Sequence, residues 1–260
     1  TMVLNAVRRR ACACSSTTER DADYLWHNNY AYTKILAEWA LEHDIRFIYA
    51  SSAATYGDGA KGFADSHKTI PGLKPINMYG YSKQVFDLWV LRQKLESRVA
   101  GIKFFNVFGP NEYHKGDMSS VIFKAFHQIK ETGKVKLFKS YKKEYKDGGQ
   151  MRDFVYVKDC VNVMWWLLQN RKVNGIFNLG TGKARSWNDL IKAVFTAMKK
   201  KTNIEYIAMP EALRNQYQYF TEAEMSKLKK AGCPFEFSSL EDSVYDYVTK
   251  YLQKSDPHLG

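Results

Sequence analysis

The sequence has few cysteines and no long apolar run, and each shortage excludes a class of protein. Its four cysteines fit neither a disulfide framework nor a CxxC…CxxC metal site. The longest obvious apolar stretch, 161–168, is interrupted by Asn162 and falls far short of the ~18 residues that span a membrane. The first twenty residues also lack the apolar centre of a signal peptide. The sequence therefore predicts a protein of the reducing cytoplasm, without a membrane segment or a metal site.

Positive charge is what the sequence has in excess. Lys and Arg total 39 against 27 Asp and Glu, so the net charge is +12. Such a balance indicates an anionic partner, which can be nucleic acid, lipid or a phosphorylated ligand. Apart from Arg8–Arg10 and the 139–146 loop, the basic residues are scattered and form no nucleic-acid motif. We therefore expect small phosphorylated ligands and no nucleic acid, with a non-catalytic basic binding protein as the alternative.

Strand-like and helix-like segments alternate along the chain. Ile45–Ala50 and Gly101–Phe105 are short apolar runs typical of buried parallel strands. Asn28–Glu42 has apolar residues at helical spacing, with Ile35, Leu36, Trp39 and Ala40 on one side. This rhythm predicts an α/β fold with a Rossmann-like, doubly wound, mainly parallel sheet. Further helices are expected at 82–93, 119–132, 158–169, 187–199, 222–230 and 240–253, and further strands at 134–138, 153–157, 176–179 and 205–208.

Two segments carry residues suited to proton transfer. In Tyr79-Gly-Tyr-Ser-Lys83 a tyrosine and a lysine stand four residues apart at a helix start, so both side chains lie on one face. An ammonium beside a phenol favours the phenolate, the form that can accept a proton. Ser52 follows the strand Ile45–Ala50, at the end of a parallel strand where doubly wound folds bind ligands. Its hydroxyl is placed to donate a hydrogen bond to a substrate oxygen.

Five short blocks follow one another along the chain. They are Ser51–Gly57, Tyr79–Lys83, Phe105–Pro110, Arg152–Asp159 and Phe177–Gly182. In this order they resemble the extended short-chain dehydrogenase/reductase family of nucleotide-sugar epimerases and dehydratases, over roughly residues 11–255. The resemblance implies that Ser52, Tyr79 and Lys83 are the catalytic serine, tyrosine and lysine, and that Lys83 also holds the nicotinamide ribose of NADP. Dehydratases of the family carry an Asp-Glu pair where this chain has Ala53-Ala54, which disfavours a dehydratase.

Three further stretches, 13–19, 28–30 and 109–116, are similar to the ADP-heptose 6-epimerases within that family. The discriminating element is His114-Lys115-Gly116, which implies that Lys115 is a second acid/base residue beside Tyr79. One proton relay on each side would let a transient carbonyl be presented in two orientations. The expected reaction is inversion at C6 of ADP-D-glycero-D-manno-heptose with tightly bound NADP, which supplies the heptose precursor of the lipopolysaccharide inner core. Another nucleotide-sugar 4-epimerase is the alternative.

The same resemblance implies a set of ligand contacts. Cofactor contacts are expected at Cys14, Ser15, Asn28, Lys83, Val107 and Lys115. Contacts to an ADP-sugar are expected at Ser52, Asn106, Asp117, Lys124, Phe138, Lys139, Ser140, Arg152 and Tyr217. Arginine suits a pyrophosphate because its planar fork binds two oxygens at once. Asp117 and Lys124 depart from the family's pattern, which has Ser and His at these positions.

The resemblance also implies two domains. Residues 1–106 and 151–182 would form a partial NADP-binding Rossmann domain, and 107–150 and 183–260 a smaller α/β substrate-binding domain. The sequence contains no Gly-rich turn that would hold a cofactor pyrophosphate at a helix N-terminus, and Ala6–Ala11 stands in the place of an apolar strand. We therefore expect an N-terminally truncated epimerase with weak NADP binding and an exposed sheet edge. A homo-oligomer, or pairing with an intact copy, is the expected assembly.

Overall fold

The computed structural model describes residues 2–5, 19, 21–214 and 217–258. The chain divides into two compact units. The first consists of Thr1–Phe105, Val161–Leu179 and Ala223–Phe235, and the second of Asn106–Cys160, Gly180–Glu222 and Glu236–Gly260.

These limits differ from the expected ones at residues 106, 151–160, 180–182 and 223–235. Residues 151–160 belong to the second unit, because β6 (Met151–Tyr156) pairs with strands of that unit. The segment Ala223–Phe235 belongs to the first unit. Its Lys227 ammonium donates to the carbonyl of Ile176 at 2.7 Å, which ties the segment to a strand of that unit.

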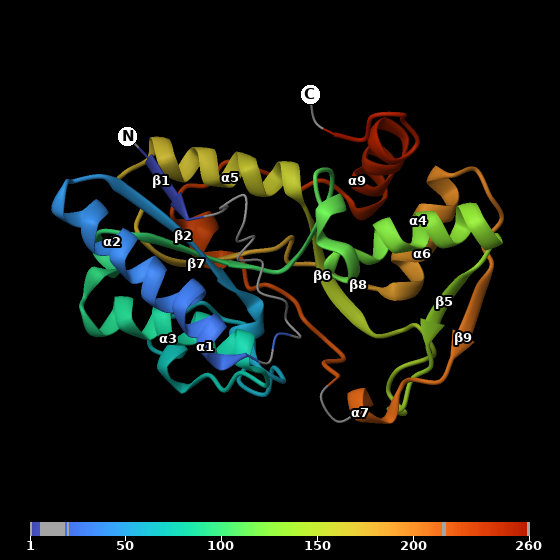
Figure 1. The fold of residues 1–260 in the computed structure, drawn as a ribbon, viewed down its shortest axis with the longest axis horizontal. Coiled ribbons are helices and arrows are strands. Elements are labelled where there is room, and N and C mark those ends of the chain that lie inside the picture. The colour runs from blue at the N-terminus through green and yellow to red at the C-terminus, as the bar shows by residue number, and fades with distance from the viewer. Residues whose placement is uncertain (1, 6–18, 20, 215–216, 259–260) are drawn as a thin grey trace. The chain divides into compact units, whose positions relative to one another are not determined.

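A four-stranded parallel sheet lies at the centre of the first unit (Figure 1). Its strands, in spatial order, are β1 (Met2–Asn5), β2 (Arg46–Ser52), β3 (Ala100–Phe104) and β7 (Gly175–Leu179). The register pairs Ser52 with Phe104 and Phe104 with Leu179, so three strands end at the same level. The expected α/β fold with a Rossmann-like parallel sheet is confirmed.

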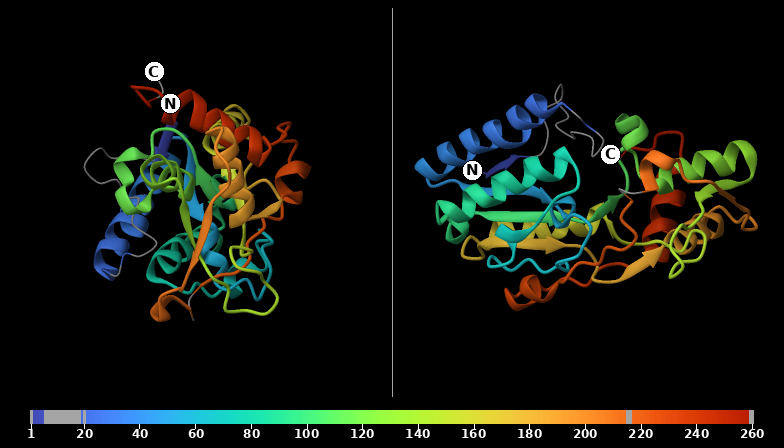
Figure 2. Two further views of the ribbon diagram at one scale, coloured as in Figure 1. Left: turned by 90° about the vertical axis from the view of Figure 1, so that its right-hand side faces the viewer. Right: turned by 90° about the horizontal axis from the view of Figure 1, so that it is seen from below.

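Helices lie along both faces of this sheet. The helices α2 (Tyr32–Glu42) and α3 (Met78–Arg92) lie side by side on one face, and the 161–169 part of α5 (Val157–Gln169) lies on the other (Figures 1 and 2). Two short helices, α1 (Ala22–Leu25) and α8 (Ser226–Lys230), complete the unit. Cover on both faces explains why β2 is an almost continuous buried run.

Only part of the apolar side that the spacing predicts for α2 is buried. Ala37 and Ala40 are fully buried, whereas Ile35 is 64% exposed and Trp39 is 45% exposed. Small side chains let the helix approach the sheet closely, so the bulky residues are left on the outer side. With Tyr32, which is also exposed, they form an apolar stripe on α2.

The second unit contains two small sheets and a helical layer. The strand β6 pairs in parallel with β4 (Asn106–Phe108) and antiparallel with β8 (Ala184–Ser186), while β5 (Val135–Phe138) pairs in parallel with β9 (Ile204–Ile207). The helices are α4 (Val121–Thr132), α6 (Trp187–Ala197), α7 (Glu211–Arg214) and α9 (Leu240–Tyr247). Apolar sides of α4, α6 and α9 share one buried core.

Local capping explains where these helices begin. Ser120 accepts the amide of Phe123 at the start of α4, and Gly133 ends that helix with a φ of 71°. Ser186 and Asp189 form a reciprocal capping box at the start of α6. The helix expected over 222–230 begins only at Ser226, because the carboxylate of Glu222 instead accepts the amide of Ala184.

The described part of the chain has neither a membrane-spanning helix nor a cluster of metal ligands. None of its helices is both long and apolar enough to cross a membrane. Within the same residues, no group of three or more His, Cys, Asp or Glu side chains is placed to hold a metal ion.

Candidate active site

The first turn of α3 carries the predicted tyrosine and lysine. The Lys83 ammonium lies 5.9 Å from the centre of the Tyr79 ring. This turn is fixed by Asn77, whose side-chain oxygen accepts the amide of Gly80 at 2.7 Å. The phenol and the ammonium are thus held close together on one helix face, as their spacing predicts.

Gly80 brings this turn against the segment that follows Ser52. A Cβ at position 80 would lie 2.7 Å from the carbonyl oxygen of Ala54 and 2.9 Å from Pro75. Any larger residue would therefore push the helix away. The hydroxyl of Ser52 accepts the amide of Ala54 at 3.1 Å, so its oxygen is oriented within the same turn. The first unit thus carries three of the four predicted catalytic residues, on β2 and α3.

The segment with the predicted cofactor contact Asn28 is fastened to this site. Asn28 lies in a π-helical turn, Trp26–Ala31, and donates to the carbonyl of Tyr24 at 2.8 Å. Its neighbour Asn29 is buried and donates to the hydroxyl of Ser82, which stands between Tyr79 and Lys83. Single π-turns are frequent at functional sites. The other predicted contacts in this region, Cys14 and Ser15, lie outside the described residues.

A buried polar network lies two turns further along α3. Asp87 and Lys103 are both fully buried and form an ion pair at 2.5 Å. The same carboxylate accepts the hydroxyls of Ser51 at 2.7 Å and Tyr49 at 3.0 Å, and Lys103 also donates to Thr55 at 2.7 Å. Burial, reinforced by Asp87, raises the pKa of Tyr49 well above its ordinary value, so the phenol remains a donor. The network joins α3, β2 and β3 behind the tyrosine and lysine.

In the second unit, Lys115 lies on a short 3₁₀ segment, Tyr113–Met118, whose ends are clamped by one carboxylate. Buried Glu112 accepts the amide and the hydroxyl of Ser120, both at 2.6 Å, and the hydroxyl of Tyr247 at 2.9 Å. The clamp fixes the loop on both sides of Lys115. Asp117, the departure from the family pattern, falls in the same segment.

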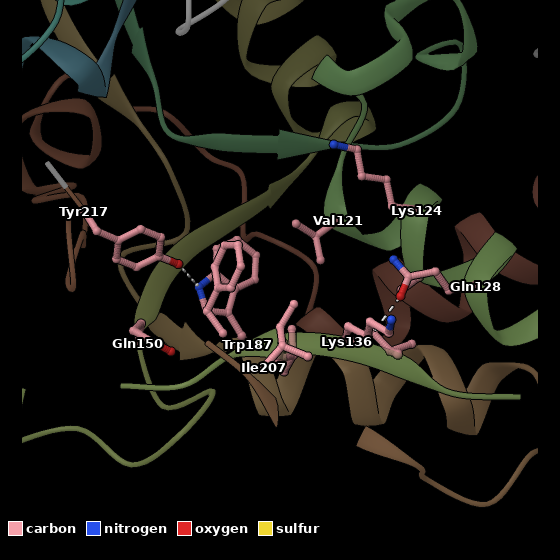
Figure 3. Close-up of a pocket in the computed structure, with 12 residues that line it drawn as sticks. Val121, Lys124, Gln128, Lys136, Gln150, Trp187, Ile207 and Tyr217 are labelled. Atoms are coloured by element: carbon pink, nitrogen blue, oxygen red, sulfur yellow. Dashed lines mark hydrogen bonds between the residues drawn. The ribbon is translucent and has the colours of Figure 1, made fainter. Parts of the chain in front are cut away.

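A pocket of 310 Å³ lies in the second unit between α4, β5 and α6 (Figure 3). Its lining is mainly apolar, and three residues predicted to contact substrate, Lys124, Phe138 and Tyr217, belong to it. The full lining is Val121, Lys124, Ala125, Gln128, Val135, Lys136, Leu137, Phe138, Gln150, Trp187, Ile207 and Tyr217. A concave apolar site with a few polar groups is the usual form of a small-molecule site.

Arg152 is stacked beside this pocket. Its guanidinium carbon lies 5.4 Å from the Tyr217 ring centre and 5.8 Å from that of Trp187. The indole of Trp187 donates to the Tyr217 hydroxyl at 3.0 Å, which holds the two rings together (Figure 3). Burial lowers the pKa of Arg152 from its ordinary value. Arg152 donates to the carbonyls of Met151 and Gln218.

The remaining predicted contacts are distributed over the second unit. Asn106 and Val107 are in β4, where Asn106 is exposed. Lys139 donates its amide to Ile207 at 2.9 Å, and Ser140 donates its amide to Asp147 at 2.7 Å. Gln128, Gln150 and Trp187 also line the pocket and were not predicted as site residues. One feature of the sequence points to Gln150: it lies two positions before the predicted Arg152, and alternate residues of an extended segment share a side.

Comparison with known proteins places the chain in a family. The sequence pattern of the NAD dependent epimerase/dehydratase family matches residues 3–180. The chain belongs to this family. It is 63% identical over 247 residues to the ADP-L-glycero-D-manno-heptose-6-epimerase of Nitratidesulfovibrio vulgaris, covering 95% of this chain and 76% of that protein. It is 52% identical over 256 residues to the enzyme of the same name from Fusobacterium nucleatum, covering 95% of this chain and 77% of that protein.

A solved structure agrees with the fold. The crystal structure of the Helicobacter pylori ADP-L-glycero-D-manno-heptose-6-epimerase superposes with a TM-score of 0.76 at 27% identity. The match covers 91% of this chain and 69% of that chain.

The described residues fit one part of the family's nicotinamide cofactor. Lys83 presents an ammonium beside Tyr79, and Ser52 lies at the carboxyl end of a parallel strand, where doubly wound folds bind nicotinamide. The 260 residues contain no Gly-rich fingerprint for the pyrophosphate. The described residues therefore suit the nicotinamide riboside end of the cofactor.

Proposed function

We propose that this chain acts as an ADP-L-glycero-D-manno-heptose 6-epimerase, which inverts C6 of an ADP-linked heptose and serves lipopolysaccharide inner-core synthesis. The observation that carries the proposal is the 63% identity over 95% of the chain to a protein of that name. The geometry around Tyr79, Lys115 and the apolar pocket supports a way in which such a reaction could proceed.

Proton movement is assigned to two residues. The Tyr79 phenolate takes the proton of the C6 hydroxyl as a carbonyl forms there, and the resulting phenol returns it as the hydroxyl re-forms. The nearby Lys83 ammonium favours the phenolate. Ser52 donates a hydrogen bond to the same oxygen. Lys115 is assigned the corresponding proton transfer for the opposite epimer. Glu112 fixes the loop that contains Lys115.

The cofactor is proposed to be NADP. When bound, it would accept a hydride from C6 and return one to that carbon. Lys83 is assigned to the nicotinamide ribose, with Asn28 and Val107 as further contacts. Assays should therefore contain saturating NADP.

The nucleotide half of the substrate is assigned to the second unit. The 310 Å³ pocket is lined on most sides by apolar groups and suits a planar base. Arg152 beside Tyr217 is assigned to the pyrophosphate, since a guanidinium can donate two parallel hydrogen bonds to phosphate oxygens. Lys139 and Ser140 continue the chain from Phe138 at the pocket and are proposed to contact the ribose.

The direct test is conversion of ADP-D-glycero-D-manno-heptose to its C6 epimer, followed by NMR with saturating NADP. Tyr79→Phe should lower the rate about 10²–10⁴-fold, because the phenolic proton carrier is lost. Tyr81→Phe is the matched control, since Tyr81 is on the same helix but 47% exposed. Equal losses in the two variants would argue against the role of Tyr79.

A substrate panel separates the alternatives. Inversion at C4 of ADP-glucose or UDP-glucose without inversion at C6 of the heptose would favour a 4-epimerase. Salt-sensitive retention on a polyanion column without affinity for any nucleotide would favour a basic binding protein.

Self-association and a cytoplasmic location are further parts of the proposal. The exposed stripe of Tyr32, Ile35 and Trp39 on α2 supports a homo-oligomer, because apolar side chains grouped on a helix face favour contact with a partner. Ile35→Glu should lower the mass measured by light scattering if this stripe is the contact. Cell fractionation tests the location.

A further inference from the structure

The pocket of the second unit contains one polar group that its surroundings leave incomplete. Gln150 lines the pocket and is only 1% exposed. Its side-chain nitrogen donates to the carbonyl of Lys139 at 3.4 Å, but its side-chain oxygen accepts no hydrogen bond from any described residue. In Figure 3, Gln150 lies at the Tyr217 and Trp187 end of the pocket.

The orientation of this amide is set by its neighbour. If oxygen and nitrogen exchanged places, two oxygens would face each other at Lys139 and an N–H group would be left unpaired. The nitrogen must therefore face Lys139, and Oε1 is the free acceptor. A buried acceptor without a donor is unfavourable, so a group that brings a donor into the pocket is favoured there.

We propose that Oε1 of Gln150 accepts a hydrogen bond from the exocyclic amino group of the nucleotide base and makes the pocket selective for adenine over 6-oxopurines. The inference rests on the proposed ADP-sugar substrate and adds the residue that recognises its base. Adenine has an N–H donor at position 6, whereas hypoxanthine has an oxygen there. That oxygen would face Oε1, leaving two acceptors unpaired, which is the arrangement by which buried polar groups reject a close analogue.

The other glutamine of the pocket provides the contrast. Gln128 lines the same pocket, but its side-chain oxygen already accepts the amide of Lys136 at 3.1 Å (Figure 3). Its oxygen is thus already paired, and its nitrogen is the group that it offers a ligand. Gln128→Met is accordingly a matched control for Gln150→Met: both remove an amide from one pocket at nearly constant volume.

The test measures binding of ADP and of inosine 5′-diphosphate (IDP) to the full chain by calorimetry, without cofactor or turnover. The unsubstituted protein should bind ADP about 10–100-fold more tightly than IDP. Gln150→Met should lose this preference by weakening ADP alone, with IDP binding unchanged as evidence of an intact pocket. Gln128→Met should keep the preference.

Equal affinity of the unsubstituted chain for ADP and IDP would overturn the role of Gln150 and leave the proposed epimerase function standing. A preference lost in Gln128→Met and retained in Gln150→Met would overturn it as well. Failure of both nucleotides to bind would overturn the proposed substrate itself, and with it this inference.

Discussion

Two buried polar clusters, one in each unit, differ in whether their groups are paired. In the first, the carboxylate of Asp87 receives Lys103, Ser51 and Tyr49, and Lys103 has a second partner in Thr55. In the second, the oxygen of Gln150 has no partner within the described residues. A completed network holds elements together, whereas an incomplete one at a pocket is a place for a ligand. The comparison therefore separates the scaffold of the proposed catalytic residues from the site proposed to recognise the nucleotide.

Removing one partner of the completed network should have the largest effect. Lys103→Met leaves the Asp87 charge buried without its counterion, so we expect the free energy of unfolding to fall by about 3–5 kcal/mol. Replacing both partners, as Lys103→Met with Asp87→Leu, should cost less than the single change, because no charge remains buried. Urea denaturation measures both.

The control for this change is Lys34→Met, which breaks an exposed pair with Glu38 at 3.5 Å. Exposed pairs contribute about 0–1 kcal/mol, so little change is expected. If the two single variants were equally stable, the buried network would not be holding the first unit together.

A smaller effect is expected at the pocket of the second unit, beside which Arg152 lies. Arg152→Lys removes the planar fork that lies against Tyr217, so ADP affinity should fall by about 1.5–3 kcal/mol while adenosine affinity stays nearly constant. Calorimetry with both ligands distinguishes a phosphate contact from a general loss of the pocket. Arg185→Lys, opposite Arg152 in the paired strands and bound to Glu241, is the matched control. Equal weakening of ADP and adenosine would assign Arg152 to pocket structure.

The smallest effect is expected on stability, at the cluster formed by Asp246 and its hydrogen-bond donors. Burial favours protonation of Asp246, but hydrogen bonds from Lys158, Lys250 and Tyr156 outweigh it and lower its pKa from 3.8 to about 2. The unfolded chain binds this proton more readily, so the contribution to stability is present above about pH 4 and is lost as the pH falls through about 2.

Asp246→Asn should therefore lower the free energy of unfolding at pH 5 by about 1–2 kcal/mol and converge with the parent protein near pH 2. Urea denaturation over a pH series measures this, with exposed Asp58→Asn as the control. A constant difference across that range would mean that the carboxylate charge does not stabilise the second unit.

Several elements of the fold could be predicted because their signals are local. The apolar run 45–50 became β2, and the spacing of Tyr79 and Lys83 placed both on one face of α3. The three-residue strands β4 and β8 were not predicted, since so short a segment has no periodicity of its own. The expected domain limits differ from the two compact units at 151–160, because spacing does not say which sheet a strand joins.

The sequence by itself determined the family, the parallel sheet and the closeness of Tyr79 and Lys83, because these depend on residue types at fixed spacings along single elements. Only the tertiary structure decided which side of α2 is buried, since that choice depends on how closely the helix approaches the sheet. It alone also singled out Gln150. Whether a buried amide is satisfied depends on what faces it from Lys139 and the rest of the pocket, and no local pattern contains that information.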